Sequence, residues 1–248
     1  MGNESPTHQK RCILCSKNAA PNKCDPEKTM DSTKYYSPLE EKTNIISHAI
    51  GLALSIVATV LMLVRASLYG NAWHVVSVSI FGASLILLYA ASTFYHSAKD
   101  PKIRSRLRVF DHATIYILIA GTYTPFTLVT LHGPVGWTVF GASWAMAVSG
   151  VILKLFYTGR YNVLSTLMYV FMGWIIMFAI KPLVNSLPSE GLYWLIAGGV
   201  AYTTGAILYS IKQIKFNHAI FHMFVLLGSF CHVVAVYFYV LPGSERLW

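Results

Sequence analysis

The sequence predicts an all-α integral membrane protein, a bundle of seven transmembrane helices with the N-terminus inside and the C-terminus outside. Hydrophobic residues make up 55% of the 248 residues and charged residues only 12%, against roughly 25% charged residues in soluble domains. The charges lie in gaps between long apolar runs. These runs show no strand-like alternation, so we expect helices rather than a closed barrel to satisfy the backbone groups in lipid.

Seven apolar runs approach or reach the length of about 20 residues that a helix needs to cross a bilayer. In chain order, they are Ile45–Val64, Trp73–Tyr95, Phe110–Leu131, Val135–Leu153, Val163–Ile180, Leu192–Ile211 and Ala219–Leu241. Residues 1–44 are polar and have no apolar segment like that of a signal peptide. We therefore predict a flexible cytoplasmic tail over residues 1–44 and a seven-transmembrane domain over residues 45–248.

The orientation follows from the positive residues between the runs. Sixteen of the 19 Lys and Arg residues fall in the tail and in the second-to-third, fourth-to-fifth and sixth-to-seventh connections. Only Arg65, Lys181 and Arg246 fall on the other side. Because cytoplasmic loops of membrane proteins carry the excess of Lys and Arg, this asymmetry places the tail in the cytoplasm, most simply at the plasma (inner) membrane. It also accounts for the net charge of +9 without a nucleic-acid partner.

Polar and ionisable residues gather at one depth once this topology is applied, near the cytoplasmic face. They are Glu41, Asn44, Ser47 and His48; Ser92 and His96; Asp111 and His112; and His218 and His222. Intramembrane ionisable residues are costly and are candidates for function by default. The spacing of Ser92 to His96 and of His218 to His222 places each pair on one helix face.

Two histidines one turn apart, a third from another helix and a nearby carboxylate suit a zinc ion, since catalytic zinc commonly has three protein ligands and a water. We predict a metal site at His96, His218 and His222, beside Asp111. His232 lies roughly 15 Å deeper along the last helix and is expected to make a buried hydrogen bond. The tail cysteines Cys12, Cys15 and Cys24 have no second CxxC pair and do not predict a site of their own.

Four ordered motifs carry a resemblance to a known family: EKTN (Glu41–Asn44), STFYH (Ser92–His96), DHATIYILIAGTYTP (Asp111–Pro125) and HAIFH (His218–His222). The chain resembles the hemolysin III branch of the adiponectin and progestin receptor family, within a superfamily that includes the alkaline ceramidases. The resemblance covers about residues 40–241. It implies a zinc near the cytoplasmic face with His96, His218 and His222 as ligands, and Ser92 and Asp111 as polar partners around a zinc-bound water.

Members of this superfamily are regarded as amide hydrolases that act on lipids such as ceramide. We therefore expect a zinc-dependent hydrolase of lipid amide or ester bonds, with membrane lipids as partners. Asp111 would orient the attacking water or take its proton, and Ser92 would stabilise the developing oxyanion. Glu41 and Asn44 would hold the first helix against the site.

A non-enzymatic protein is the alternative: a hemolysin, a sensor of bilayer state or a receptor. Its zinc would be structural, tying the inner ends of three helices together. A closed site with four protein ligands would favour this alternative, whereas an open position for water favours catalysis.

Overall fold

The computed structural model describes residues 36–157 and 162–243 of the chain. Within these ranges all regular structure is helical, and seven spans are long and apolar enough to cross a membrane, so the predicted all-α bundle of seven spans is confirmed. Most of the predicted tail, with its three cysteines, lies outside the described residues. The spans are Pro38–Tyr69, Ala72–Ser97, Pro101–Leu131, Gly133–Phe156, Leu164–Ser186, Ser189–Ser210 and Asn217–Val240.

Three of the described spans are made of more than one helical segment or change helix type near one end. The elements are α1 (Pro38–Tyr69), α2 (Ala72–Ser97), α3 (Pro101–Pro125) with the π-helix η2 (Phe126–Leu131), α4 (Gly133–Tyr157), α5 (Asn162–Gly173), the 3₁₀-helix η3 (Ile175–Ala179), α6 (Ile180–Ser186), α7 (Ser189–Ser210), and α8 (Asn217–Ala235) with the π-helix η4 (Val236–Val240). The change from α3 to η2 comes directly after Pro125, which removes a backbone donor from the ladder. The fifth span is the most interrupted, because it runs through α5, η3 and α6 in turn.

Two helices begin earlier than the apolar runs predicted. The first begins at Pro38 rather than Ile45, and the third at Pro101 rather than Phe110. Each has a capping residue just before the proline: Ser37 Oγ accepts from the Glu40 amide at 3.3 Å, and Asp100 Oδ1 accepts from the Lys102 amide at 2.8 Å. Proline suits the first helical turn, where an amide donor would have no partner. Charged turns therefore extend these two helices beyond their apolar parts.

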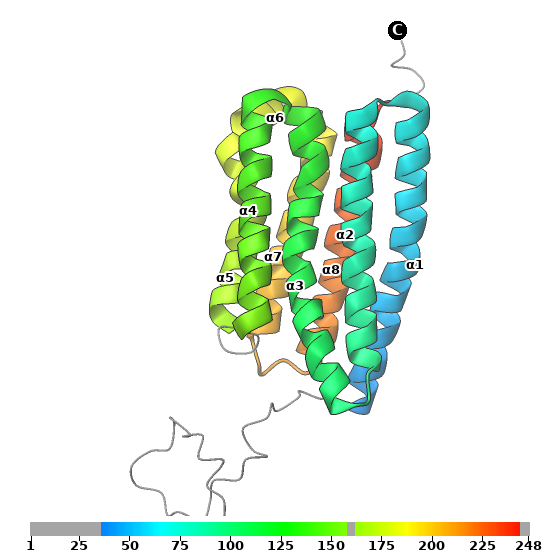
Figure 1. Ribbon diagram of the computed structural model, residues 1–248, viewed down its shortest axis with the longest axis vertical. Coiled ribbons are helices and arrows are strands. Elements are labelled where there is room, and N and C mark those ends of the chain that lie inside the picture. Colours follow the sequence, from blue (N-terminus) through cyan, green and yellow to red (C-terminus); the bar gives the residue numbers. More distant parts are fainter. Residues whose placement is uncertain (1–35, 158–161, 244–248) are drawn as a thin grey trace, which may run out of the picture. The chain divides into compact units, whose positions relative to one another are not determined.

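The described helices stand side by side in one bundle (Figure 1). Helices α1 to α4 follow one another as neighbours, and α8 packs against both α7 and α1, which brings the last span back to the first. The start of α1, the end of α2 and the starts of α3 and α8 lie together at the lower end in Figure 1. We call this the histidine end, because the predicted metal ligands lie there, and we call the other half of the bundle the apolar half.

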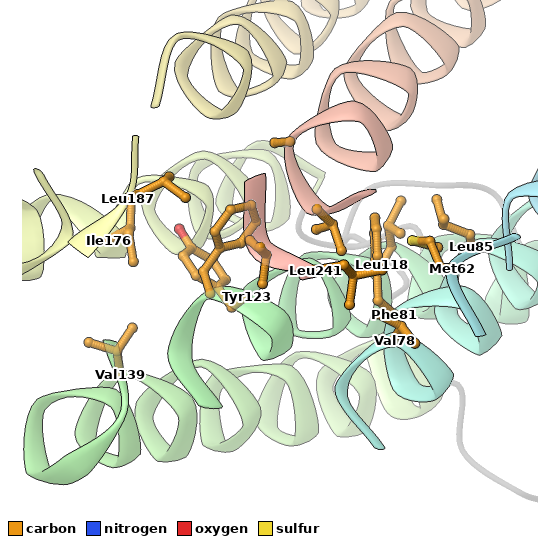
Figure 2. Close-up of a cluster of buried hydrophobic side chains, with 14 of the residues drawn as sticks. Met62, Val78, Phe81, Leu85, Leu118, Tyr123, Val139, Ile176, Leu187 and Leu241 are labelled. Atoms are coloured by element: carbon orange, nitrogen blue, oxygen red, sulfur yellow. The ribbon is translucent and has the colours of Figure 1, made fainter. Parts of the chain in front are cut away.

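The apolar half contains the main hydrophobic core (Figure 2). Met62, Phe81, Leu85 and Leu241 are among the side chains of this cluster, and each is at most 1% exposed. Helices approach closely here: a side chain at Gly82 would collide with Thr59 of the neighbouring helix. Such small residues at helix contacts are typical of packing in lipid, where dispersion replaces the hydrophobic effect as the driving force.

Candidate metal centre

Three imidazole rings meet at the histidine end. His96 lies in the last turn of α2, and His218 and His222 lie in the first turns of α8; all three are buried. Their ligand-type nitrogen atoms all lie within 4.8 Å of one another, and Nε2 of His96 is 3.0 Å from Nε2 of His218. Within the described part of the chain the group has three members, all histidines. The predicted ligands are thus brought together and could hold a metal ion.

The start of α8 is set by its own residues. Phe216 adopts a left-handed conformation with φ of 59°, which turns the chain sharply into the helix. The Asn217 side chain donates to the carbonyl of Tyr209 at 2.9 Å and so ties this start to the end of α7. His218 and His222 follow one turn apart, so that both rings project from the same helix face.

A carboxylate orients one of the three rings. Oε2 of Glu41 in α1 lies 2.7 Å from Nδ1 of His96. An ionised carboxylate only accepts hydrogen bonds, so Nδ1 of His96 is the donor in this pair, and in the neutral ring Nε2 is then the nitrogen with a lone pair for a metal. Carboxylate partners of this kind fix the tautomer and the ring direction of metal-binding histidines. Glu41 is therefore a supporting residue with a defined contact.

Arg104 in α3 is buried beside this pair, with 1% of its surface exposed. Its guanidinium forms an ion pair with the second oxygen of Glu41. Nη1 also donates to three carbonyls at the end of α2, those of Tyr95, His96 and Ala98, at 3.3 to 3.4 Å. The sequence interpretation gave Arg104 to a connecting loop as a determinant of topology. The structure corrects the placement in a loop: Arg104 lies inside α3, and its contacts join α1, α2 and α3.

Aromatic and hydroxyl groups enclose the other two rings. His48 stacks on His222 with ring centroids 3.5 Å apart, and Ser47 Oγ lies 3.4 Å from Nδ1 of His222. Tyr36 stacks on His218 at 4.6 Å. Burial raises the pKa of Tyr36, so this residue covers His218 as a neutral ring. Sequence reasoning placed His48 at this depth without giving it a role, and it missed Tyr36.

The predicted catalytic residues lie on the wall of a cavity of about 430 Å³ that also reaches His218 and His222. Asp111 and Ser92 are both buried, with 9% and 1% of their surfaces exposed. Among the described residues, Ser92 Oγ and both polar atoms of the Asn44 amide have no hydrogen-bond partner. Buried polar groups are costly to leave unpaired, so these atoms are suited to meeting a ligand or an ordered water.

The cavity extends from the histidines into the apolar half. Its wall includes Leu118, Tyr202 and, farther along, Leu183. His232 also lines it and lies 3.2 Å through Nε2 from the carbonyl of Leu195, which is the buried hydrogen bond expected for this residue. Ligand pockets are commonly 300–1,000 Å³ and mostly apolar with a few convergent polar groups. This cavity has that character, with its polar groups gathered at one end.

The donor set suits a transition metal. Imidazole nitrogens bind zinc, copper, iron and nickel, whereas magnesium and calcium prefer carboxylate, carbonyl and water oxygens. Three imidazoles from two helices would hold such a metal, one protein ligand fewer than the four of a closed structural zinc site. Chemically, such a centre can polarise a carbonyl oxygen that enters through the cavity.

Comparison with known proteins agrees with these features. The family described as "Haemolysin-III related" matches residues 36–233. "Hemolysin-3" of Bacillus cereus is 47% identical over 206 residues, which cover 83% of this chain and 94% of the relative. "Hemolysin-3 homolog" of Bacillus subtilis (strain 168) is 46% identical over 200 residues, covering 81% and 94%. The human "Monocyte to macrophage differentiation factor" is 29% identical over 209 residues, covering 81% and 84%. With all seven spans inside or overlapping the matched region, the chain belongs to the haemolysin-III-related family and is an integral, multi-pass membrane protein.

Proposed function

We propose that this protein is a zinc-dependent hydrolase of lipid amide or ester bonds that works within the membrane. One observation carries the proposal: His218 and His222, two of the three grouped histidines, line a largely apolar cavity whose wall also holds Asp111 and Ser92. A metal site that served only to join helices would need no cavity and no carboxylate beside it. When bound, zinc supplies a Lewis acid that acidifies a water and polarises a scissile carbonyl.

Side chains of this protein supply proton transfer, stabilisation of the oxyanion and orientation of the histidines. The Asp111 carboxylate accepts the proton of the attacking water and returns it to the leaving amine or alcohol. The Ser92 hydroxyl donates a hydrogen bond to the carbonyl oxygen as negative charge develops on it. Glu41 keeps Nδ1 of His96 protonated and its Nε2 directed to the metal site, and the same carboxylate holds α1 against this site. The amide of Asn44, which has no hydrogen-bond partner among the described residues, is left to bind an ordered water or a ligand.

The cavity favours a lipid substrate. Its apolar part accepts an acyl chain, while its polar end holds the amide or ester group at the histidines. The family resemblance points to a ceramide-like lipid, which would reach the cavity from the surrounding bilayer. The bundle is suited to that surrounding, since leucines and valines along α1, such as Leu54, Val57 and Leu61, are exposed on its outer surface.

A structural metal is the second candidate, in a hemolysin, membrane sensor or receptor. It is favoured by one observation: the contacts around the three histidines connect α1, α2, α3 and α8. A metal there would stabilise the bundle with or without catalysis. The two candidates differ in what they require of Asp111.

The test is Asp111→Asn, with zinc content, folded yield and turnover of a panel of lipid amides measured in one preparation. We expect normal zinc and yield, and a turnover lower by about 10²–10⁴-fold, the usual effect of losing a general base. Glu190→Gln, an exposed carboxylate in α7, is the matched control and should keep full turnover. Undiminished turnover in Asp111→Asn would remove Asp111 from the mechanism. No turnover by the wild type on the whole panel would favour the structural metal.

We also propose that the histidine end faces the cytoplasm at the plasma membrane, because the positive residues predominate on that side. A reporter inserted at Lys99, between α2 and α3, should be active inside, and one fused after Trp248 should be active outside. An inside position for the reporter after Trp248 would contradict this orientation.

A further inference from the structure

Arg104 is unusual among the positive residues near the start of α3. Its neighbour Arg106 is exposed, as expected for a residue that only marks the cytoplasmic side, whereas Arg104 is 1% exposed. Burying a guanidinium is costly unless it is paired and its donors are satisfied. Arg104 contacts Glu41 and the carbonyls at the end of α2, close to the metal centre, so the position of these contacts has a consequence for that centre.

The contacts reach His96 by two routes. Through its ion pair, Arg104 holds the Glu41 carboxylate, whose other oxygen lies 2.7 Å from Nδ1 of His96. Through Nη1, it also binds the backbone carbonyl of His96 itself at 3.3 Å. Its guanidinium lies 4.7 Å from the centre of the Tyr95 ring, which fixes it in position from another side. One side chain therefore restrains both the ring of His96 and the backbone that carries it.

We propose that Arg104 is a positioning residue for the metal centre, which sets the affinity for the metal by holding Glu41 against His96. The inference rests on the metal binding of the proposed function but not on its hydrolytic step. Without Arg104, the carboxylate would lose its second partner and the last turn of α2 would lose its link to α3. The His96 ring could then rotate or adopt the other tautomer, and fewer molecules would present Nε2 to the metal.

The shape of the side chain matters to this role. Arginine offers five donors in a planar fork, so it can bind a carboxylate and several carbonyls together. Lysine offers a compact charge on a flexible stem, and it could keep the ion pair while losing the carbonyl contacts. Arg104→Lys should therefore retain part of the effect, and Arg104→Gln should lose it.

The experiment uses purified full-length protein and competition with a chelator to measure zinc affinity. For Arg104→Gln we expect an affinity 10- to 100-fold weaker, the usual cost of losing a partner that orients a ligand. Arg104→Lys should fall between this variant and the wild type. Arg106→Gln, the exposed neighbour, should match the wild type. The absorption spectrum of bound Co²⁺ should change for Arg104→Gln, because it reports the geometry of the ligands, and stay unchanged for Arg106→Gln.

A double variant separates positioning from general stabilisation. If Arg104 acts through Glu41, adding Arg104→Gln to Glu41→Gln should weaken zinc binding by less than threefold beyond Glu41→Gln alone, since residues in one network are not additive. Fully additive losses, or an unchanged affinity in Arg104→Gln, would overturn the inference while leaving the metal centre in place. A wild-type protein that binds neither zinc nor Co²⁺ would overturn the centre and this inference together.

Discussion

The two ends of the bundle are held together in different ways. At the histidine end, a few side chains make directional contacts between distant helices, such as Glu41 with His96 and with Arg104. In the apolar half, many side chains such as Phe81 and Met62 pack without directed bonds. Dispersion contacts are individually weak and numerous, so packing tolerates the loss of one member better than a charged network does. Specific chemistry is thus concentrated at one end, and stability is spread through the other.

The strongest way to break the histidine end is to remove a ligand. We expect His222→Ala to lose most of its zinc, measured as metal per chain after gel filtration, because two remaining imidazoles hold zinc far less well than three. Its melting temperature should also fall. The matched control is His232→Ala, which removes a buried histidine from the same helix but from the apolar half, and which should keep zinc near the wild-type level. Full zinc occupancy in both His96→Ala and His222→Ala would contradict the proposed centre.

A substitution in the apolar half should lower the stability of the bundle without changing its zinc content. Phe81→Ala removes a fully buried ring from the core. We expect the free energy of unfolding to fall by an amount near the lower end of the range of about 3–5 kcal/mol known for soluble cores. The effect is at the lower end because lipid, rather than water, surrounds the ring when the helices separate. Thermal or denaturant unfolding in detergent measures this loss, and zinc per folded chain should not change. Phe94→Ala, at a lipid-facing site of the same helix that is 59% exposed, should cost much less. Equal losses for the two variants would argue against the packing described for α2.

The smallest expected effect belongs to a neutral hydrogen bond inside the bundle. Tyr89 donates to Ser229 Oγ at 2.7 Å and so links α2 to α8. Tyr89→Phe keeps the ring and removes this bond together with the longer contact of the hydroxyl to the Val225 carbonyl at 3.4 Å. The loss should cost about 0.6 kcal/mol and no more than about 1.7 kcal/mol, the range measured for such bonds in membranes. Unfolding measurements against Tyr193→Phe, whose residue is 69% exposed, give the comparison. A loss of zinc in Tyr89→Phe would show that the two regions are more tightly coupled than this comparison implies.

Much of the fold could be predicted from the sequence, because lipid imposes a simple length and polarity rule on each span. The rule failed at the starts of α1 and α3, where charged turns continue the helix past the apolar run. The missing signal was present in both places: Ser37–Pro38 and Asp100–Pro101 are each a capping residue followed by proline, a recognised helix start. Counting apolar residues overlooks that signal because it treats every charged turn as a loop.

The candidate site was predictable in part for a similar reason. His96, His218 and His222 could be grouped from helix spacing and topology alone, and the structure brings them together. Arg104 could not be assigned to the site in this way, because its role there depends on pairing with Glu41, which lies 63 positions away in sequence. A helix that begins at Pro101 places Arg104 and Asp111 seven residues apart on one face. Recognising this early start would therefore have predicted that Arg104 faces the site.

The sequence distances within the centre have a consequence for how the protein is made. His96 and His218 are 122 positions apart, and Ser47 and His222 are 175 positions apart. Helices enter the membrane in the order of synthesis, so α1, α2 and α3 must wait with their polar inner ends incomplete until α8 arrives. Metal capture is therefore a late event that only a chain with α8 in place can complete. A bound metal would then mark molecules whose insertion has succeeded, and cells short of the metal would accumulate chains open to quality control.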